Sequence, residues 1–111
     1  MFSAVLDFFT DKHCYSLTEI VIQKCNLGST ERVALRIKDF IKNSSVKRVE
    51  LSEMKLSSRD FCVICLGVGA RSSFGELSMR DNKVGEIAKK CLDVLLKFNK
   101  EVKIDLSNNP I

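Results

Sequence analysis

The spacing of apolar residues between Phe74 and Val84 constrains the fold of this chain most. Apolar side chains at Phe74, Leu77, Met79 and Val84 follow the pattern L-x-x-L-x-L-x-x-N-x-L, with Asn82 in the polar slot. Leu77 and Met79 alternate with polar residues, which predicts a short, half-buried strand. An Asn suits a turn, because its side chain can hydrogen-bond the backbone of neighbouring segments. The segment therefore predicts a strand followed by a tight turn.

The same pattern occurs four times along the chain. The residue equivalent to Leu77 is Ile20 in the first copy, Val49 in the second and Ile104 in the last, so the copies are 29, 28 and 27 residues apart. Parallel strands need a crossover of about a dozen residues, which is usually a helix. The recurrence therefore predicts four parallel strands joined by helices. The units begin near residues 17, 46, 74 and 101, and the strands are expected near residues 19–23, 48–52, 76–80 and 103–107.

The segments between these strands predict helices near residues 30–43, 58–66 and 86–98. In the first segment the apolar residues have the spacing of an amphipathic helix (Val33, Ile37, Phe40 and Ile41). The middle segment is apolar nearly all round, so we expect it to be sandwiched between its neighbours.

Local signals indicate where the middle helix begins and ends. Ser57 followed by Asp60 is typical of a helix start, and Gly67 or Gly69 is typical of a helix end. Residues 1–11 carry an apolar stripe with helical spacing and predict a helix, within an N-terminal cap of residues 1–16, that covers the first unit.

The repeated spacing resembles the ribonuclease-inhibitor-like subclass of leucine-rich repeat proteins, with strand–helix units of about 28 residues. Similar repeats occur in the sensor domains of NOD-like receptors and in bacterial effectors. The resemblance covers about residues 17–111. It implies an α/β fold, a right-handed leucine-rich repeat solenoid with parallel strands on the concave side and helices on the convex side. The whole chain, residues 1–111, is expected to form a single domain.

The cysteines predict a reducing environment. The chain has five, an odd number, mostly at core-facing positions: Cys14, Cys25, Cys62, Cys65 and Cys91. Free Cys is among the most buried residue types. The opening segment lacks an early basic region, and no apolar run approaches 18 residues. We therefore expect reduced thiols, no membrane span and a cytoplasmic protein, or one delivered into a host cytosol if it is an effector.

Two pairs of residues carry the alternative hypothesis of a cysteine-dependent enzyme or redox protein. His13 adjoins Cys14, but neighbours in a helix point in different directions. Cys62 and Cys65 form a C-x-x-C inside a predicted helix, without the second ligand pair that a zinc site needs. The prediction is therefore a protein that is not an enzyme and has no cofactor and no metal.

The basic residues do not predict a nucleic-acid partner. The net charge is +4, but Lys and Arg are spread along the predicted helices and interleaved with acidic residues. No platform of arginine and aromatic residues accompanies them. A solvated outer face accounts for them better.

The side of the sheet away from the helices is where a protein partner is expected to bind. Charged residues on this side form a mixed, net acidic patch: Glu50, Glu53, Arg80, Asp81 and Asp105. The opposing interpretation is a polar face whose charges pair with each other, as the alternating row of Glu19, Arg48, Glu76 and Lys103 indicates. The patch carries no aromatic anchor of the kind that dominates binding energy in interfaces. The predicted function is a protein–protein interaction module, either an adaptor or an effector.

The last copy of the pattern ends at Ile111, directly after its strand and turn. Strand 103–107 is therefore expected to keep one unpaired edge, which can pair with another chain. The sequence predicts either a longer array or a homodimer that forms through this C-terminal edge.

Overall fold

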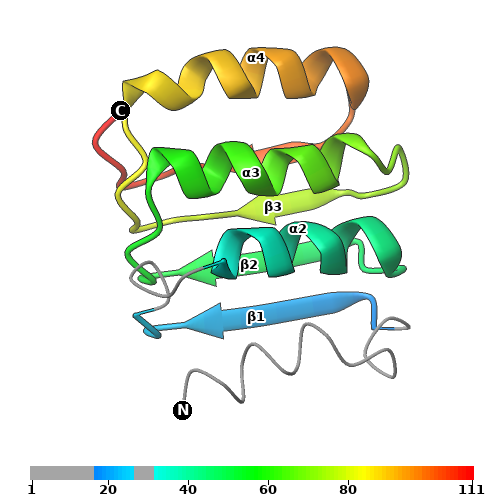
Figure 1. Ribbon diagram of the computed structural model, residues 1–111, viewed down its shortest axis with the longest axis horizontal. Helices are drawn as coiled ribbons and strands as arrows, with labels where there is room; N and C mark the ends of the chain where they lie inside the picture. The colour runs from blue at the N-terminus through cyan, green and yellow to red at the C-terminus, as the bar shows by residue number, and fades with distance from the viewer. Residues whose placement is uncertain (1–16, 27–31) are drawn as a thin grey trace.

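Four parallel strands form one sheet in the computed structural model, which describes residues 17–26 and 32–111. Their order follows the chain, so that each strand pairs with the next one (Figure 1). The register places Ile20 beside Val49, Val49 beside Leu77 and Leu77 beside Ile104. The predicted positions and parallel pairing are confirmed, although the last two strands are shorter than expected. The strands are β1 (Glu19–Gln23), β2 (Arg48–Ser52), β3 (Glu76–Ser78) and β4 (Lys103–Asp105).

The helices connect successive strands and lie together on one face of the sheet (Figure 1). The predicted helix at 86–98 begins as a 3-10 turn before it becomes α-helical. The described helical elements are α2 (Val33–Asn43), α3 (Ser58–Gly69), η2 (Glu86–Ala88) and α4 (Lys89–Phe98). The result is a two-layer arrangement in which the described helices cover one face of the sheet and none of them lies on the other face, which we call the open face.

The core lies between the sheet and the helices. Leu77 and Met79, which the strand pattern predicts to be buried, have no exposed surface. Leu95 of α4 is buried in the same core, and Phe40 of α2 and Phe61 of α3 are fully buried as well. The alternation of buried and outward residues along each strand therefore follows the sequence pattern.

Asn82 holds the turns of two neighbouring units together. Its side-chain oxygen accepts hydrogen bonds from the backbone N–H groups of Met54 (3.0 Å) and Leu56 (3.1 Å). Its side-chain nitrogen donates to the carbonyls of Leu51 (2.7 Å) and Arg80 (3.0 Å). The prediction that this Asn bonds the backbone of neighbouring segments is confirmed. Because Asn82 is buried, these bonds satisfy backbone groups that water cannot reach.

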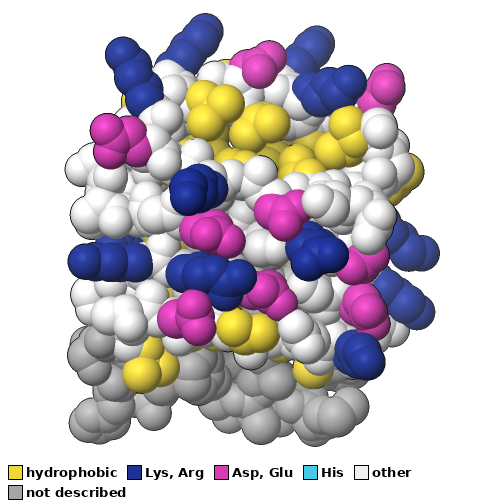
Figure 2. Space-filling view, turned by 180° about the vertical axis from the view of Figure 1, so that it is seen from behind, with side chains coloured by type: hydrophobic (Ala, Val, Ile, Leu, Met, Phe, Trp, Pro, Cys, Tyr) yellow, Lys and Arg dark blue, Asp and Glu magenta, His cyan; other side chains and the backbone are white. Residues whose placement is uncertain are grey.

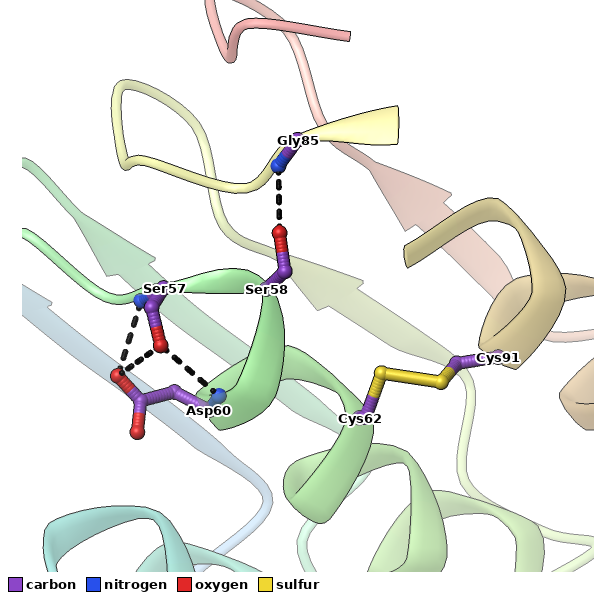
Figure 3. The surroundings of a disulfide bond; sticks show 6 residues. All are labelled: Ser57, Ser58, Asp60, Cys62, Gly85 and Cys91. Atoms are coloured by element: carbon purple, nitrogen blue, oxygen red, sulfur yellow. Dashed lines mark hydrogen bonds between the residues drawn. A yellow bond between two sulfur atoms is a disulfide. The ribbon is translucent and has the colours of Figure 1, made fainter. Parts of the chain in front are cut away.

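Both ends of α3 agree with the predicted signals: it begins after Ser57, and it ends at Gly69, one of the two glycines predicted to end it. The Ser57 side chain accepts a bond from the Asp60 N–H, and the Asp60 carboxylate accepts one from the Ser57 N–H, as Figure 3 shows. This reciprocal pair is a capping box. Gly67 does not end the helix, because α3 continues to Gly69. Gly67 is instead buried where α3 meets α2: a Cβ atom there would lie 2.5 Å from the carbonyl oxygen of Lys38.

The classification as a right-handed leucine-rich repeat solenoid is wrong. Over the residues that it describes, the structure is a small, compact α/β domain of four parallel strands and three α-helices, measuring 33 × 28 × 18 Å. A spacing of 27–29 residues is the length of one strand together with its crossover to the next strand, and it does not require an extended array of coils. The helix predicted within the cap of residues 1–16 lies outside the described residues.

Candidate interaction surfaces

The open face of the sheet is covered with charged side chains, as Figure 2 shows from the side opposite to the helices. Lys and Arg side chains alternate there with Asp and Glu side chains over the middle of the face. We call this surface the sheet face. We include in it the turns that follow the strands, so that it takes in the five residues that the sequence predicts for partner binding: Glu50, Glu53, Arg80, Asp81 and Asp105.

Arg48 of β2 is the centre of an ion-pair network on the sheet face. Its guanidinium nitrogens lie 3.4 Å from Glu19, 2.9 Å from Glu50 and 3.3 Å from Glu76. Glu19 and Glu76 are its register partners on β1 and β3. The hydrogen bond from Arg48 to Glu50 is the main cause of the raised Arg48 pKa. The predicted ladder of cross-strand pairs is therefore present over three strands.

Glu50 is already satisfied by its neighbours. Its carboxylate accepts hydrogen bonds from Gln23 (2.7 Å), Arg48 (2.9 Å) and Ser52 (3.3 Å). The bond from Gln23, followed by that from Arg48, lowers the Glu50 pKa. A carboxylate with this many internal partners has few lone pairs left for another protein.

Asp105 and Arg80 form a second, separate pair on the sheet face. Their charged atoms are 3.8 Å apart, and the Asp105 carboxylate also accepts hydrogen bonds from the backbone and side chain of Ser107. The bonds from Ser107 are the main cause of the lowered Asp105 pKa. Ser78, the residue between Glu50 and Asp105 in the register, separates this pair from the Arg48 network.

Glu53 and Asp81 project from the turns that follow β2 and β3. Both have left-handed backbones, with φ of 54° and 58°, and Lys24 and Asn108 adopt the same conformation in the equivalent turns. Both side chains are exposed. The five predicted residues therefore divide between an internally paired centre and two exposed turn positions, and their role in binding stays a prediction.

A different surface, which the sequence interpretation did not single out, lies between α3 and α4 on the helical side. It is a groove of about 500 Å³ with almost entirely apolar walls. We call it the α3–α4 groove. Its walls include Cys62, Leu66 and Gly69 from α3 and Lys90, Val94 and Phe98 from α4.

Large apolar side chains remain exposed along this groove. Leu66 is 66% exposed, Phe98 72% and Val94 51%, and Ile87, at the start of the same helical segment, is 75% exposed. The expectation that the apolar middle helix is sandwiched between its neighbours is confirmed, because α3 contacts both α2 and α4, but Leu66 remains exposed beside α4. The spacing of apolar residues could not predict this surface, because a Leu at helical spacing fits the pattern equally well whether it is buried or exposed.

A disulfide between Cys62 and Cys91 joins α3 to α4 at the groove (Figure 3). The two Cα atoms are 5.6 Å apart, and the cysteines are separated by 29 residues in the chain. The prediction of reduced thiols is wrong for this pair. Cys62 bonds to α4 rather than to Cys65, so the C-x-x-C does not act as a pair in this structure.

Cys65 is a buried free thiol. Burial raises its pKa to about 12, which keeps it protonated and weakly nucleophilic at neutral pH. The other proposed nucleophile and base, Cys14 and His13, lie outside the described residues. Within residues 17–26 and 32–111, no group of three or more His, Cys, Asp or Glu side chains could hold a metal ion.

No helix in the described part of the chain combines the length and the apolar character needed to cross a membrane.

Comparison with known proteins identifies a fold but no family. No family model matches the chain, and no curated protein matches it either. A solved structure described as leiomodin-1 actin-binding site 2 is similar, with a TM-score of 0.75 and 16% sequence identity. The match covers 98% of this chain and 63% of that structure's chain.

The comparison, like the structure, contradicts the classification of this chain as a leucine-rich repeat solenoid. The similar structure is described as an actin-binding site and not as a leucine-rich repeat protein of the ribonuclease-inhibitor-like kind. At 16% identity the likeness shows the fold alone. The shared feature is the compact α/β domain, so the terms repeat protein and solenoid do not apply to this chain.

Proposed function

We propose that this protein is a protein-interaction module and that the α3–α4 groove is its main contact surface. The observation that carries the proposal is the exposure of Leu66, Val94 and Phe98 along one apolar groove. Monomeric proteins rarely expose contiguous large apolar patches, and such patches mark interaction sites. Aromatic anchors of the Phe98 kind contribute much of the binding energy in protein interfaces.

The comparison supports the class of partner but not its identity. A domain of the same fold is described as an actin-binding site, so this shape binds a protein in at least one case. Because this chain matches only 63% of the length of that structure's chain, actin is a probe to test and not an assigned partner.

The sheet face is the second candidate surface for a protein partner. Glu53 and Asp81, its exposed turn residues, support this candidate. The internal pairing of Arg48 with three carboxylates weakens it, since a partner would have to displace bonds that already exist.

The role as an enzyme has less support among the described residues. Cys62 is bonded to Cys91 and Cys65 is buried, so neither is an exposed thiolate in this structure. A nucleophilic cysteine needs an accessible thiol with a lowered pKa. We therefore favour binding over catalysis.

The test compares capture of partners by variants of the two surfaces. Wild-type protein, Leu66→Ser/Phe98→Ser and Glu53→Ala/Asp81→Ala are immobilised and incubated with cell extract, and bound proteins are quantified by mass spectrometry. Leu35→Ser is the matched control, because Leu35 is 43% exposed on α2 and does not line the groove. Purified actin is tested in the same format.

We expect to capture a partner protein that binds the wild-type protein and the Leu35 variant directly, each with a measurable Kd. The same partner should not bind the Leu66/Phe98 variant. If only the Glu53/Asp81 variant loses binding, the sheet face and not the α3–α4 groove is the contact surface. Identical capture by all variants would contradict a protein-interaction role for both surfaces.

A further inference from the structure

The apolar surface at the α3–α4 groove is longer than the groove itself. Ile87 is 75% exposed but does not line the groove, and it continues the helical spacing of Val94 and Phe98. From Ile87 to Phe98 this stripe is about 17 Å long at the helical rise per residue. A compact small molecule that filled the groove would leave Ile87 exposed, so the surface fits an elongated ligand better.

The shape of the surface favours a helix over an extended chain. Leu66 of α3 and the apolar stripe of α4 form two walls, and the floor between them includes Gly69, which has no side chain. A Cβ atom at Gly69 would lie 3.6 Å from Leu95 and 4.0 Å from Phe98, which are ordinary contact distances, so a larger side chain at this position would fill the space between the two helices. An amphipathic helix inserts an apolar stripe into a groove of this kind. An extended strand would bind a sheet edge, and the groove offers only helices.

One charged residue gives the groove its electrostatic preference. Lys90 is the only charged side chain among the described lining residues. Within the described part of the chain its ammonium group has no ion-pair partner, and Asp93, on the same helix, does not pair with it. Lys97 follows seven residues later, two helical turns along the same side of α4. Asp93 lies between the two lysines on this side of α4, so the group at the groove that can bind a carboxylate is Lys90 itself.

We propose that the α3–α4 groove binds an amphipathic helix of a partner protein, about three turns long, whose apolar stripe contacts Leu66, Val94 and Phe98 and whose flanking acidic residue pairs with Lys90. The inference rests on the proposed function, because it names the chemistry of the partner at the same surface. It adds two requirements that general protein binding does not impose: the bound segment is helical, and it is acidic on the side of α4.

The probe is a synthetic peptide of about 14 residues, stapled into a helix on its outer side, with Leu and Phe at helical spacing and Glu beside them. Two matched peptides accompany it: one with the same residues in scrambled order and one with each Glu replaced by Lys. Binding to the oxidised, full-length protein is measured by fluorescence anisotropy at low and high salt.

The structure predicts that the acidic helix binds at least about tenfold more tightly than the scrambled peptide. Phe98→Ser removes an aromatic contact, and Gly69→Met places a large side chain in the groove. Each change should weaken binding by about tenfold or more. Lys90→Glu should weaken the acidic peptide about tenfold and strengthen the basic one. Lys103→Glu on β4 makes the same change in net charge away from the groove and should leave both affinities unchanged.

Five results would overturn the inference. Equal binding of the helical and scrambled peptides contradicts a helix-specific site. If Lys90→Glu does not reverse the preference between the acidic and the basic peptide, the acidic partner is wrong. Self-association that Phe98→Ser abolishes, with no peptide binding, indicates a second copy of this chain. Groove-dependent binding of an apolar dye alone indicates a small apolar ligand. If a captured extract protein requires the groove while the acidic helix does not bind, the proposed function stands and the helical partner is wrong.

Discussion

The two places where α3 meets its neighbouring helices are built in opposite ways. Between α2 and α3, Gly67 allows close contact between the two backbones, with the Lys38 carbonyl 2.5 Å from the position of a Cβ atom. Between α3 and α4, the Cys62–Cys91 disulfide joins the two helices, and a hydrogen bond of 2.7 Å runs from the Gly85 N–H, just before η2, to Ser58 at the start of α3 (Figure 3). A groove of about 500 Å³ remains beside the disulfide.

This difference shows that equal units along the chain do not produce equal contacts between helices. The strands on either side of α3 pair in the same parallel way, and the crossovers have nearly the same length. The side chains where the helices meet differ: a glycine closes one contact, whereas exposed Leu66 and Phe98 line the other. The closed contact, between α2 and α3, is closely packed and stabilises the fold, and the open contact, between α3 and α4, leaves apolar surface exposed for binding.

Removal of the disulfide is expected to have the largest effect on the open contact. The bond closes a loop of 29 residues, and its loss should lower the free energy of unfolding by about 3–4 kcal/mol through the entropy of the unfolded chain. Urea unfolding of wild-type protein with and without a phosphine reductant measures this change. The reductant should have no effect on Cys62→Ser/Cys91→Ser, and equal midpoints for oxidised and reduced wild type would contradict the bond.

Gly67→Ala tests the closed contact. The added methyl group would overlap a backbone carbonyl, which cannot rotate away as a side chain can. We expect a loss of about 1–3 kcal/mol despite the better helix propensity of Ala. Chemical denaturation measures this loss, and a more stable variant would show that the helices are not in close contact at this position.

Gly69→Ala is the matched change at the open contact, in the same helix. Here the new methyl group meets Leu95 and Phe98 at ordinary van der Waals distances. Because Ala restricts the unfolded chain more than Gly, we expect a gain of about 0.5 kcal/mol. Measured beside Gly67→Ala, it should shift the denaturation midpoint in the opposite direction, and a loss of comparable size at both positions would show that the two contacts are equivalent.

Phe98→Ser should have the smallest effect on stability. A side chain that is 72% exposed loses little burial when it is truncated, so the change is expected to stay within about 0.5 kcal/mol. Thermal and chemical unfolding check this expectation. A loss of several kcal/mol would mean that Phe98 is part of the core, and its effect on partner capture would then reflect unfolding.

Features that depend on neighbouring residues could be predicted from the sequence. The strand positions, the buried pair Leu77 and Met79, the hydrogen-bonding role of Asn82 and the start of α3 follow from local spacing and local bonding. Each of these features needs only one unit, or one unit and the next. The classification as a solenoid failed because the unit length does not reveal how far an array extends.

The candidate binding surfaces were only partly predictable. Strand alternation placed Glu50, Arg80 and Asp105 on the open side of the sheet, and it also indicated that charges on that side pair internally. It did not identify the α3–α4 groove, because an apolar residue at helical spacing is normally buried. Whether Leu66 is covered depends on how far α4 lies from α3, a distance that no local pattern contains.

The sequence by itself determined which segments form strands and helices and which side of each faces the core, since these follow from the periodicity of apolar residues along one element. Only the tertiary structure decided that Cys62 meets Cys91, that Gly67 contacts the backbone of α2, and that Leu66 and Phe98 remain exposed. These three outcomes depend on distances between helices that are far apart in the chain. Such distances are set by the packing of all layers together, so residues that look alike in the sequence have different surroundings in the folded domain.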